Sequence, residues 1–420
     1  MEGASMRIGI VSPRYIDQDV RGGEEIPKTL AITLSKDNDV IVLTSDAYDL
    51  RAEHLFFGKR HQSRLETDGN VLVERYHSFS FAGTFLYVID RVVFRRLSKG
   101  NPRLYSNILA DLIRIHGWGP LTLEIYGRIT GGNFDVIHSF VYPTYTSFIS
   151  LIASKAAGVP FVFTPFYHFR DNSVKNSRLF RYMIRNSDAL IACTNMERDE
   201  LINIGSDPDS THVIQPGFDM NLAKVSQLIS NNFADDLGLR GNHVVLMHPW
   251  STKGAIEMLD AIDALLERRS DFAILTIGEP DGEYLSKKKE LLRRHKFANI
   301  IDFGWVSGAK KWAVLSLCDV FVMMSFNDAF GLSYINAWSL GKPIIGARGS
   351  FAEDIIKNGI DGLLIDIADK AEASKAIEYL FDNPSIRNEI GRNGKLKVAN
   401  YLSNTRFAKE MTNVYSALIK

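Results

Sequence analysis

A short stretch in the second half of the chain carries residue types that suit an anionic ligand rich in hydroxyl groups. Asp328 stands before Phe330-Gly331-Leu332, and Asn336 follows Asp328 after seven residues. A helix that begins near Gly331 would point its first amides toward a phosphate or sugar oxygen. Asp328 would then accept hydrogen bonds from sugar hydroxyls, and Asn336 would bind a ribose diol. The same residues also fit a loop before a buried helix, with Asp328 only an N-terminal charge.

Two further motifs follow the first expected strand. Gly22 and Gly23 lack a Cβ, which lets the backbone approach a diphosphate, although a plain turn is the other interpretation. Asp17-Gln18-Asp19 has the form of a metal-binding pair, but its place directly after the strand does not suit that role, and we expect no metal site. No GxGxxG follows a strand and no GxxxxGK[ST] occurs, which disfavours dinucleotide-dependent dehydrogenases and P-loop enzymes.

Composition limits the classes of protein that remain. The 420 residues include 49 Lys and Arg against 49 Asp and Glu, so whole-chain charge does not favour a nucleic-acid partner. Hydrophobic residues make up 45% of the chain, as in folded globular proteins. Cys193 and Cys318 lie in apolar runs and form no disulfide framework, and the first residues lack a charged region before an apolar stretch. We therefore expect a cytoplasmic protein.

Short, apolar, β-branched segments alternate with helical ones along the chain. Strands that are apolar throughout are typical of a parallel sheet buried on both faces, and the alternation predicts doubly wound α/β domains. The pattern occurs twice, with a break in a polar stretch near residue 222, which gives domains 1–222 and 223–403. We expect the two domains to face each other across a cleft, with ligands at the carboxyl ends of the strands. The expected strands are 7–11, 40–44, 71–76, 134–138, 161–164, 189–193, 212–214, 243–247, 272–277, 299–303, 320–324, 343–346 and 362–365.

These motifs together resemble the retaining glycosyltransferases of the GT-B fold, specifically glycosyltransferase family 4. That family has a glutamate, a Gly-Phe-Gly-Leu or similar turn, a second glutamate after seven intervening residues, and then Gly-x-Pro before a strand. Asp328, Phe330-Gly331-Leu332, Asn336 and Gly341-Lys342-Pro343 stand at the matching places. Both acidic positions depart from the pattern, because Asp is one methylene shorter than Glu and Asn carries no charge.

The resemblance covers nearly the whole chain and implies further site residues. Lys253 matches a family lysine on the donor diphosphate, and His248 stands where the family has an arginine. Gly22-Gly23 match the glycine pair that opens the first helix. His138 and His168 match strand ends that contact the donor sugar or the acceptor. The position two residues after His138, which often carries the family's active histidine, is Phe140 here.

The resemblance implies two Rossmann-like domains and a last helix, 404–418, that returns to the first domain, so that residues 404–420 belong to it. The implied activity is transfer of a glycosyl group, of the hexosyltransferase type, from a nucleotide-diphosphate sugar to a hydroxyl with retention. Neither a metal nor a cofactor is implied, since Lys253 and backbone amides would stabilise the leaving diphosphate. A GT-B sugar-nucleotide epimerase or hydrolase and a catalytically degenerate binding or scaffold protein are the alternatives.

One segment of the first domain has the composition of a membrane-surface helix. Residues 81–97 combine aromatic and aliphatic side chains with Arg91, Arg95 and Arg96. Such a helix can lie on an anionic membrane or receive a lipid-linked acceptor, and it also fits a core helix with arginines at its edge. We expect the first role, which would place the protein peripherally at the inner membrane face. The sequence specifies neither the donor's base and sugar nor the acceptor and oligomeric state.

Overall fold

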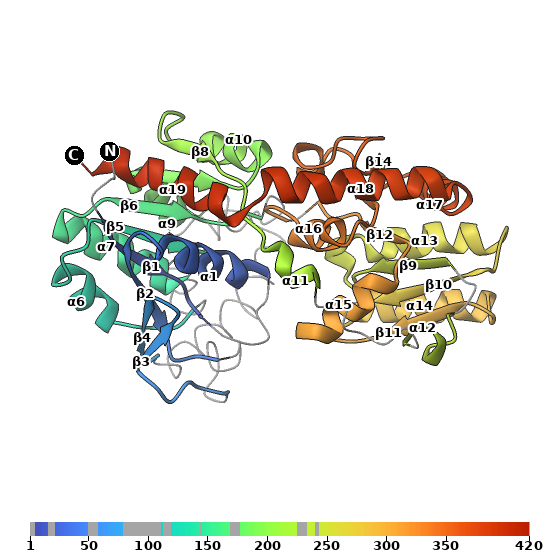
Figure 1. Ribbon diagram of the computed structural model, residues 1–420, viewed down its shortest axis with the longest axis horizontal. Coiled ribbons are helices and arrows are strands. Elements are labelled where there is room, and N and C mark those ends of the chain that lie inside the picture. The colour runs from blue at the N-terminus through green and yellow to red at the C-terminus, as the bar shows by residue number, and fades with distance from the viewer. Residues whose placement is uncertain are drawn as a thin grey trace. The chain divides into compact units, whose positions relative to one another are not determined.

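The chain folds into two compact units, each built around a parallel sheet. The computed structural model describes residues 5–15, 22–48, 58–78, 111, 119–142, 144–168, 177–224, 233–239, 243–326 and 328–419. Unit 1 comprises Met1–Gly217 with Asn404–Lys420, and unit 2 comprises Phe218–Ser403. Figure 1 shows helices packed around the central sheet of each unit. The segment 81–97 and the Asp17-Gln18-Asp19 motif lie outside the described residues.

The sheet of unit 1 has eight strands in the order β3-β4-β2-β1-β5-β6-β7-β8. All neighbours pair in parallel except β3, an edge strand that pairs antiparallel with β4. The central strands are buried along almost their whole length, as their apolar sequences predict. The strands are β1 Arg7–Val11, β2 Asp39–Ser45, β3 Leu65–Asp68, β4 Val71–Tyr76, β5 Val136–Phe140, β6 Phe161–Thr164, β7 Ala189–Ala192 and β8 Thr211–Val213.

Several helices of unit 1 begin at a polar residue whose side chain caps the helix. α7 begins after Thr144, whose side chain accepts a hydrogen bond from the Ser147 amide, and it ends at Gly158 in the left-handed conformation. The C-terminal helix α19 packs against α1, so it completes the first unit (Figure 1). Among the described residues of unit 1, the helices are α1 Gly22–Leu34, α6 Glu124–Thr130, α7 Tyr145–Ala157, α9 Arg178–Asn186, α10 Asn195–Ile204 and α19 Asn404–Leu418.

Unit 2 has a six-stranded, fully parallel sheet in the order β11-β10-β9-β12-β13-β14. Its strands are β9 His243–Met247, β10 Phe272–Thr276, β11 Asn299–Asp302, β12 Val320–Met323, β13 Ile344–Ala347 and β14 Leu363–Ile365. Its helices are α11 Met220–Lys224, α12 Phe233–Asp236, η4 Ser251–Lys253, α13 Ala255–Leu266, α14 Gly282–Arg294, α15 Gly308–Leu317, α16 Leu332–Ser339, η5 Phe351–Asp354, α17 Lys370–Asp382 and α18 Pro384–Tyr401.

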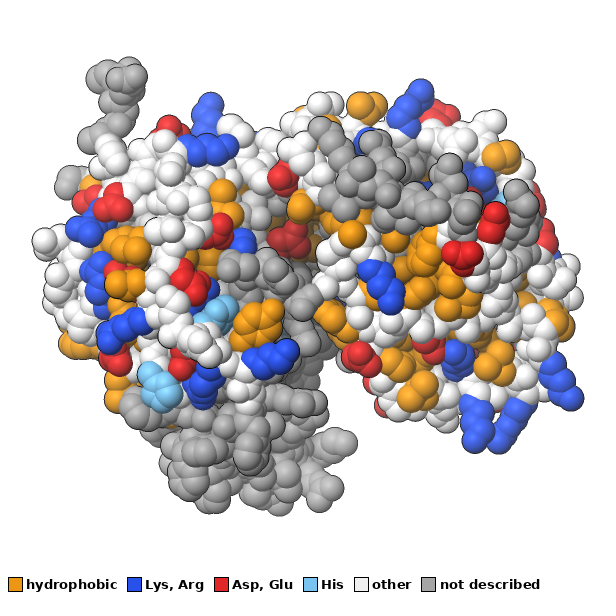
Figure 2. All heavy atoms as spheres, turned by 60° about the horizontal axis from the view of Figure 1, so that its bottom comes forward, with side chains coloured by type: hydrophobic (Ala, Val, Ile, Leu, Met, Phe, Trp, Pro, Cys, Tyr) orange, Lys and Arg blue, Asp and Glu red, His pale blue; other side chains and the backbone are white. Residues whose placement is uncertain are grey.

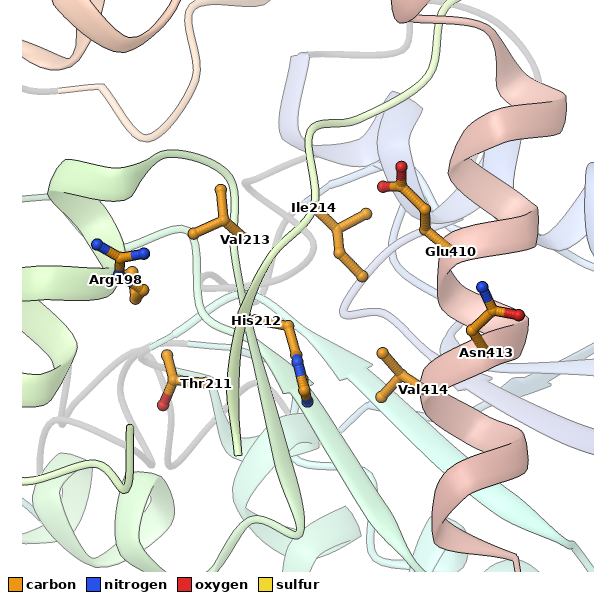
Figure 3. Close-up of a pocket in the computed structure, with 8 residues that line it drawn as sticks. All are labelled: Arg198, Thr211, His212, Val213, Ile214, Glu410, Asn413 and Val414. Carbon is orange, nitrogen blue, oxygen red and sulfur yellow. The ribbon is translucent and has the colours of Figure 1, made fainter. Parts of the chain in front are cut away.

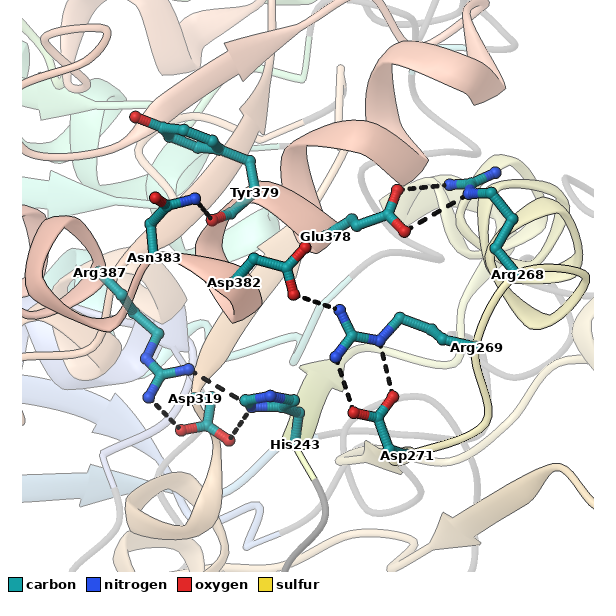
Figure 4. A network of polar contacts seen from close by, with 10 residues as sticks. All are labelled: His243, Arg268, Arg269, Asp271, Asp319, Glu378, Tyr379, Asp382, Asn383 and Arg387. Carbon is teal, nitrogen blue, oxygen red and sulfur yellow. Dashed lines mark hydrogen bonds and ion pairs between the residues drawn. The ribbon is translucent and has the colours of Figure 1, made fainter.

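A network of ion pairs joins α17 and α18 to the amino ends of the strands in unit 2 (Figure 4). Arg269 donates to Asp271 and Asp382, and Arg387 pairs with Asp319, which precedes β12. The His243 ring, at the start of β9, stacks on Phe381 at 4.4 Å between centroids. These contacts lie at the end of the sheet opposite to its carboxyl edge, so they belong to the scaffold of unit 2.

Among the described residues, none of the helices combines the length and apolar character that a bilayer crossing requires. In the same part of the chain, no three His, Cys, Asp or Glu side chains are grouped as metal ligands.

Candidate functional site

Two neighbouring strands bring the candidate residues of unit 2 together. β9 and β12 pair in parallel, so their carboxyl ends lie at the same edge of the sheet. β9 leads through His248 into η4, which ends at Lys253, and then into α13. β12 leads past Asp328 to Gly331 and α16. Segments about 75 residues apart in the sequence therefore meet at this edge.

Glycines start both helices at this edge. Gly254 and Gly331 have φ angles of 78° and 75°, in the left-handed region that favours glycine. A Cβ on Gly254 would overlap the Met324 carbonyl oxygen, and a Cβ on Gly331 would lie 2.6 Å from the Phe351 ring. Both positions therefore require glycine for conformation and for space, and the backbone at the helix starts packs closely against its surroundings.

The first amides of these two helices are not capped by side chains. Neither Gly254 before α13 nor Gly331 before α16 provides a capping hydrogen bond. By contrast, α14 begins at Asp281, whose carboxylate accepts from the Tyr284 amide. Uncapped amides at a helix start carry partial positive charge and favour an anion. The Ala255 amide of α13 already donates to the Trp250 carbonyl oxygen, and the Tyr334 amide of α16 donates to that of Gly331. The backbone donors suited to phosphate at this edge are therefore the other amides of the two first turns.

Lys253 and Asp328 form an ion pair with each other. The Lys253 ammonium donates to Asp328 Oδ1, and the two side chains are only 19% and 15% exposed. The second carboxylate oxygen, Oδ2, is buried and accepts no hydrogen bond from the described residues. The pair thus combines a partly buried cation with a carboxylate that retains an unfilled acceptor.

His248 is a neutral ring in this structure. Its Nδ1 lies 2.8 Å from the carbonyl oxygen of Ile277, which can only accept, so Nδ1 carries the proton and Nε2 accepts from the Ser333 hydroxyl at 2.8 Å. The pKa of His248 is lowered to about 4, mainly by burial, and the nearby Lys253 charge acts in the same direction. His248 therefore supplies hydrogen bonding and no positive charge at neutral pH.

The remaining candidates of unit 2 lie on or just before α16. Phe330 is buried, Leu332 is partly exposed, and Asn336 is 6% exposed. Asn336 lies about one turn after Ser333, the hydroxyl that binds His248. Ser333 was not among the residues predicted from the sequence, because no pattern around it indicates a histidine partner far away in the chain.

His138 of unit 1 lies inside the protein. It is the third residue of β5 and is 0% exposed, with Nδ1 2.6 Å from the Tyr415 hydroxyl and Nε2 2.8 Å from Thr164 Oγ1. Burial lowers the pKa of His138 to about 3, and its ring stacks on Phe140. Both ring nitrogens bind protein groups, so a contact with a sugar would require one of these bonds to be exchanged.

His168 and Gly23, two other candidates of unit 1, are exposed. His168 is exposed four residues after the end of β6. Gly22 and Gly23 are the first two residues of α1, and a Cβ added at Gly23 would meet no atom within 4 Å. Gly23 therefore leaves open space at this helix start, although, unlike Gly254 and Gly331, it is not required by its neighbours.

A separate pocket of about 440 Å³ lies in unit 1 between β8, α10 and α19 (Figure 3). Its charged residues are already paired, since Arg198 donates to Asp199 and Glu410 accepts from Arg406. Burial lowers the pKa of His212 in the same pocket. None of the candidate residues lines this pocket. On the face drawn in Figure 2, the described Lys and Arg side chains are likewise interspersed with acidic and apolar ones.

Comparison with known proteins relates both units to one enzyme class. Residues 20–222 match the family described as Glycosyltransferase Family 4, and residues 249–397 match Glycosyl transferases group 1. The D-inositol 3-phosphate glycosyltransferase of Pseudarthrobacter chlorophenolicus is 28% identical over 298 residues, which are 66% of this chain and 69% of that protein. The enzyme of the same name from Nocardioides sp. is 23% identical over 320 residues, or 68% and 67%.

Solved structures show the same fold. HepE of Anabaena in complex with UDP and glucose superposes with a TM-score of 0.68 at 16% identity, covering 98% of this chain and 100% of that one. The UDP-forming α,α-trehalose-phosphate synthase of Burkholderia vietnamiensis gives a TM-score of 0.73 at 11% identity, with 99% of both chains covered. Both units thus match glycosyltransferase families, and the chain belongs to the GT-B glycosyltransferases that resemble glycosyltransferase family 4.

Proposed function

We propose that this protein transfers a glycosyl group from a nucleotide-diphosphate sugar to an acceptor hydroxyl, with retention at the anomeric carbon. The observation that carries the proposal is the Lys253–Asp328 pair beside the uncapped starts of α13 and α16. Diphosphate needs a cation and backbone donors, and a sugar needs hydrogen-bond acceptors. This edge of unit 2 brings all three groups together, from segments far apart in the sequence.

The leaving diphosphate is the group that Lys253 and the helix amides stabilise. As the bond from the anomeric carbon to the phosphate oxygen breaks, negative charge grows on that oxygen, and preorganised donors lower the barrier. His248 adds no charge at neutral pH, so Lys253 is the cation on which the proposal depends. We propose that these donors suffice without a metal ion.

Asp328 and Asn336 serve the uncharged parts of the donor. The buried, unfilled Oδ2 of Asp328 is suited to accept a hydrogen bond from a sugar hydroxyl. Asn336 lies further along α16 and offers its amide to the ribose. The acceptor hydroxyl binds on the side of His168, which is exposed, whereas we assign His138 no contact with either substrate.

Retention requires no protein nucleophile in this proposal. The acceptor oxygen forms its bond to the anomeric carbon on the face from which the phosphate departs, and its proton passes to the leaving phosphate oxygen. The inositol phosphate and UDP-forming relatives favour a UDP sugar and an acceptor with a free hydroxyl. A lipid-linked acceptor at a membrane surface stays a prediction, since it rests on residues 81–97.

The test is a panel of UDP, GDP, ADP and dTDP sugars, first by thermal shift and then with candidate acceptors. We expect one base to raise the melting temperature and its sugar to appear in an acceptor-dependent product, with the anomeric configuration retained by NMR. Release of free sugar without acceptor would indicate a hydrolase. Binding without any product would indicate a scaffold protein, and no binding at all would contradict the proposal.

A further inference from the structure

Unit 1 contains a fully buried carboxylate that joins two strand ends. Glu197 lies in the first turn of α10 and is 0% exposed. Its Oε1 accepts from the Tyr167 amide at 2.7 Å, and its Oε2 accepts from the Cys193 amide at 2.6 Å. A carboxylate hidden from water is costly unless its oxygens are bound, and here each oxygen has a backbone donor.

The two donors belong to neighbouring strands. Tyr167 follows β6 and Cys193 follows β7, and these strands pair in parallel, so both amides lie at the carboxyl edge of the sheet. Glu197 stands three residues after Thr194, the residue that caps α10. In an ordinary capping box such a glutamate binds the amide of the capping residue itself. Glu197 instead reaches past the helix start to both strand ends.

Further hydrogen bonds hold the segment to which this carboxylate binds. Thr164 binds His138 through its side chain and accepts from the Val141 amide at 3.0 Å. The backbone is strained just after β5 and just after β6, because Val141 and Phe166 have φ angles of 73° and 52° without being glycine. Such conformations persist only where the surroundings enforce them, and they are frequent at functional sites. His168, the exposed candidate, follows directly after Tyr167.

We propose that Glu197 is a positioning residue for glycosyl transfer, which fixes the 164–168 segment and thereby the place of His168 on the acceptor side. This inference rests on the proposed function, in which His168 faces the acceptor. Glu197 touches neither substrate. It acts through the Tyr167 amide, one residue before His168, and through the Cys193 amide, which anchors the start of α10.

The charge of Glu197 makes this role sensitive to pH. Burial raises the pKa of Glu197 to about 7, whereas the two backbone amides lower it only in part. The titratable group that faces it is the Cys193 thiol, whose pKa burial raises well above its usual value. His138, across the segment, stays neutral throughout this range. Protonation turns one carboxylate oxygen of Glu197 into a hydroxyl, which accepts less strongly, so the bond from one of the two amides weakens.

The experiment compares Glu197→Gln with the wild type, using Asp199→Asn on the exposed side of α10 as the matched control. We expect Glu197→Gln to lower kcat by about tenfold or more, because small displacements of a substrate-positioning group are costly. UDP affinity, a property of unit 2, should change less than about twofold. The wild-type kcat should rise through pH 7, and Glu197→Gln should lose that rise. When His168→Ala is combined with Glu197→Gln, the double variant should have a kcat only slightly lower than that of Glu197→Gln alone.

Two outcomes would overturn the inference: a Glu197→Gln enzyme with wild-type kcat and pH profile, or effects of Glu197→Gln and His168→Ala that simply multiply. If Glu197→Gln does not fold, the test is a pH titration of the wild type followed by NMR. The amide signals of Tyr167 and Cys193 should then shift together through pH 7. A wild type that binds UDP sugars but never transfers them contradicts the proposed function instead, while these amide signals still report on Glu197.

Discussion

The cation and the carboxylate of the candidate donor site, Lys253 and Asp328, are bound to each other in this structure. Under the proposed function, an incoming diphosphate would compete with Asp328 for the Lys253 ammonium. Once phosphate replaces the carboxylate, Asp328 is released to accept from a sugar hydroxyl. The pair would thus link the arrival of the diphosphate to the release of a sugar-binding group, and this exchange of partners can be measured.

We predict that Asp328→Asn binds free nucleoside diphosphate more tightly than the wild type does. The variant removes the carboxylate that competes for Lys253 and repels phosphate, and a change of about 1 kcal/mol corresponds to about fivefold in Kd. Turnover should fall at the same time, because the amide lacks the charge of the carboxylate. Calorimetry with UDP at low salt measures the affinity. Weaker UDP binding by Asp328→Asn would show that the carboxylate does not oppose the nucleotide.

Lys253→Met should abolish most of the turnover while the fold stays intact. Loss of a charge-assisted contact to the leaving group costs about 2–4 kcal/mol of transition-state stabilisation, or about 30- to 1000-fold in rate. Lys310→Met is the matched control, since Lys310 is an exposed lysine of the same unit. The comparison is made by steady-state kinetics at saturating donor. Equal turnover in the two variants would remove Lys253 from the mechanism.

Asn336→Glu should bind the nucleotide sugar about tenfold more tightly. A carboxylate accepts from both ribose hydroxyls with charge-assisted bonds, whereas the amide of Asn336 offers a single oxygen. Asn336→Asp is the control, because it adds the same charge on a shorter side chain. Calorimetry should show that Asn336→Glu binds the nucleotide sugar more tightly than Asn336→Asp and the wild type do. An Asn336→Glu variant that binds no better than the wild type would place the ribose elsewhere.

Sequence patterns predicted the strands of both sheets with one omission. β3 was missed because Leu65–Asp68 is a polar edge strand that alternates between exposed and partly buried positions, and it pairs antiparallel next to the Gly69 turn. Apolar runs such as β6 and β9 were predicted to the residue, because strands buried on both faces leave little freedom in their boundaries.

The residues of the candidate site that follow a strand end could be predicted from the sequence. Features that depend on the precise bounds of a strand or on tertiary contacts could not. The strand expected at 134–138 is β5, Val136–Phe140, because the Asp135 carboxylate binds the Arg7 amide and the strand starts after it. This shift of two residues places His138 in the middle of a buried strand instead of at its end. The pairing of Lys253 with Asp328 and of His248 with Ser333 depends on tertiary contacts that no local pattern encodes.

A buried ion pair in unit 1 should be important for stability and unimportant for the donor site. Arg128 of α6 binds both oxygens of Glu74, which is 8% exposed on β4 and also accepts from the Tyr76 hydroxyl. Burial favours the neutral acid, but the bonds from Arg128 and Tyr76 lower the pKa of Glu74 overall. Arg128→Met leaves the carboxylate without its cation and should cost about 3 kcal/mol in urea unfolding.

The control for this ion pair is Arg348→Met in unit 2, whose partner Glu372 is partly exposed, so its loss should cost much less stability than the loss of Arg128. UDP affinity should be the same in Arg128→Met and the wild type. A loss of stability no larger than that of Arg348→Met would mean that Glu74 finds another donor or a proton.

Acid should destabilise the protein partly through neutral histidines, of which His138 is fully buried. Burial lowers the pKa of His138 to about 3 in the folded state, whereas an unfolded histidine has a pKa near 6.5. As the pH falls below 6.5, the unfolded chain binds a proton that the folded chain does not bind. The free energy of unfolding therefore falls by up to about 1.4 kcal/mol per pH unit. Glu197 has the opposite sign, because its folded pKa is raised to about 7 and the folded chain holds the extra proton between pH 7 and 4.5.

His138→Gln isolates the histidine contribution, because Glu197 is present in both proteins and cancels. The variant should be less stable than the wild type at pH 7, since it disturbs the bonds to Tyr415 and Thr164. That deficit should shrink by about 2 kcal/mol between pH 6.5 and pH 5, because glutamine takes up no proton. Tyr415→Phe removes a hydrogen bond to His138 without removing the titrating ring, so we expect its deficit to stay nearly constant over the same range. Urea unfolding of the three proteins at both pH values provides the measurement, and a His138→Gln deficit that is independent of pH would mean that the ring is protonated in the folded state.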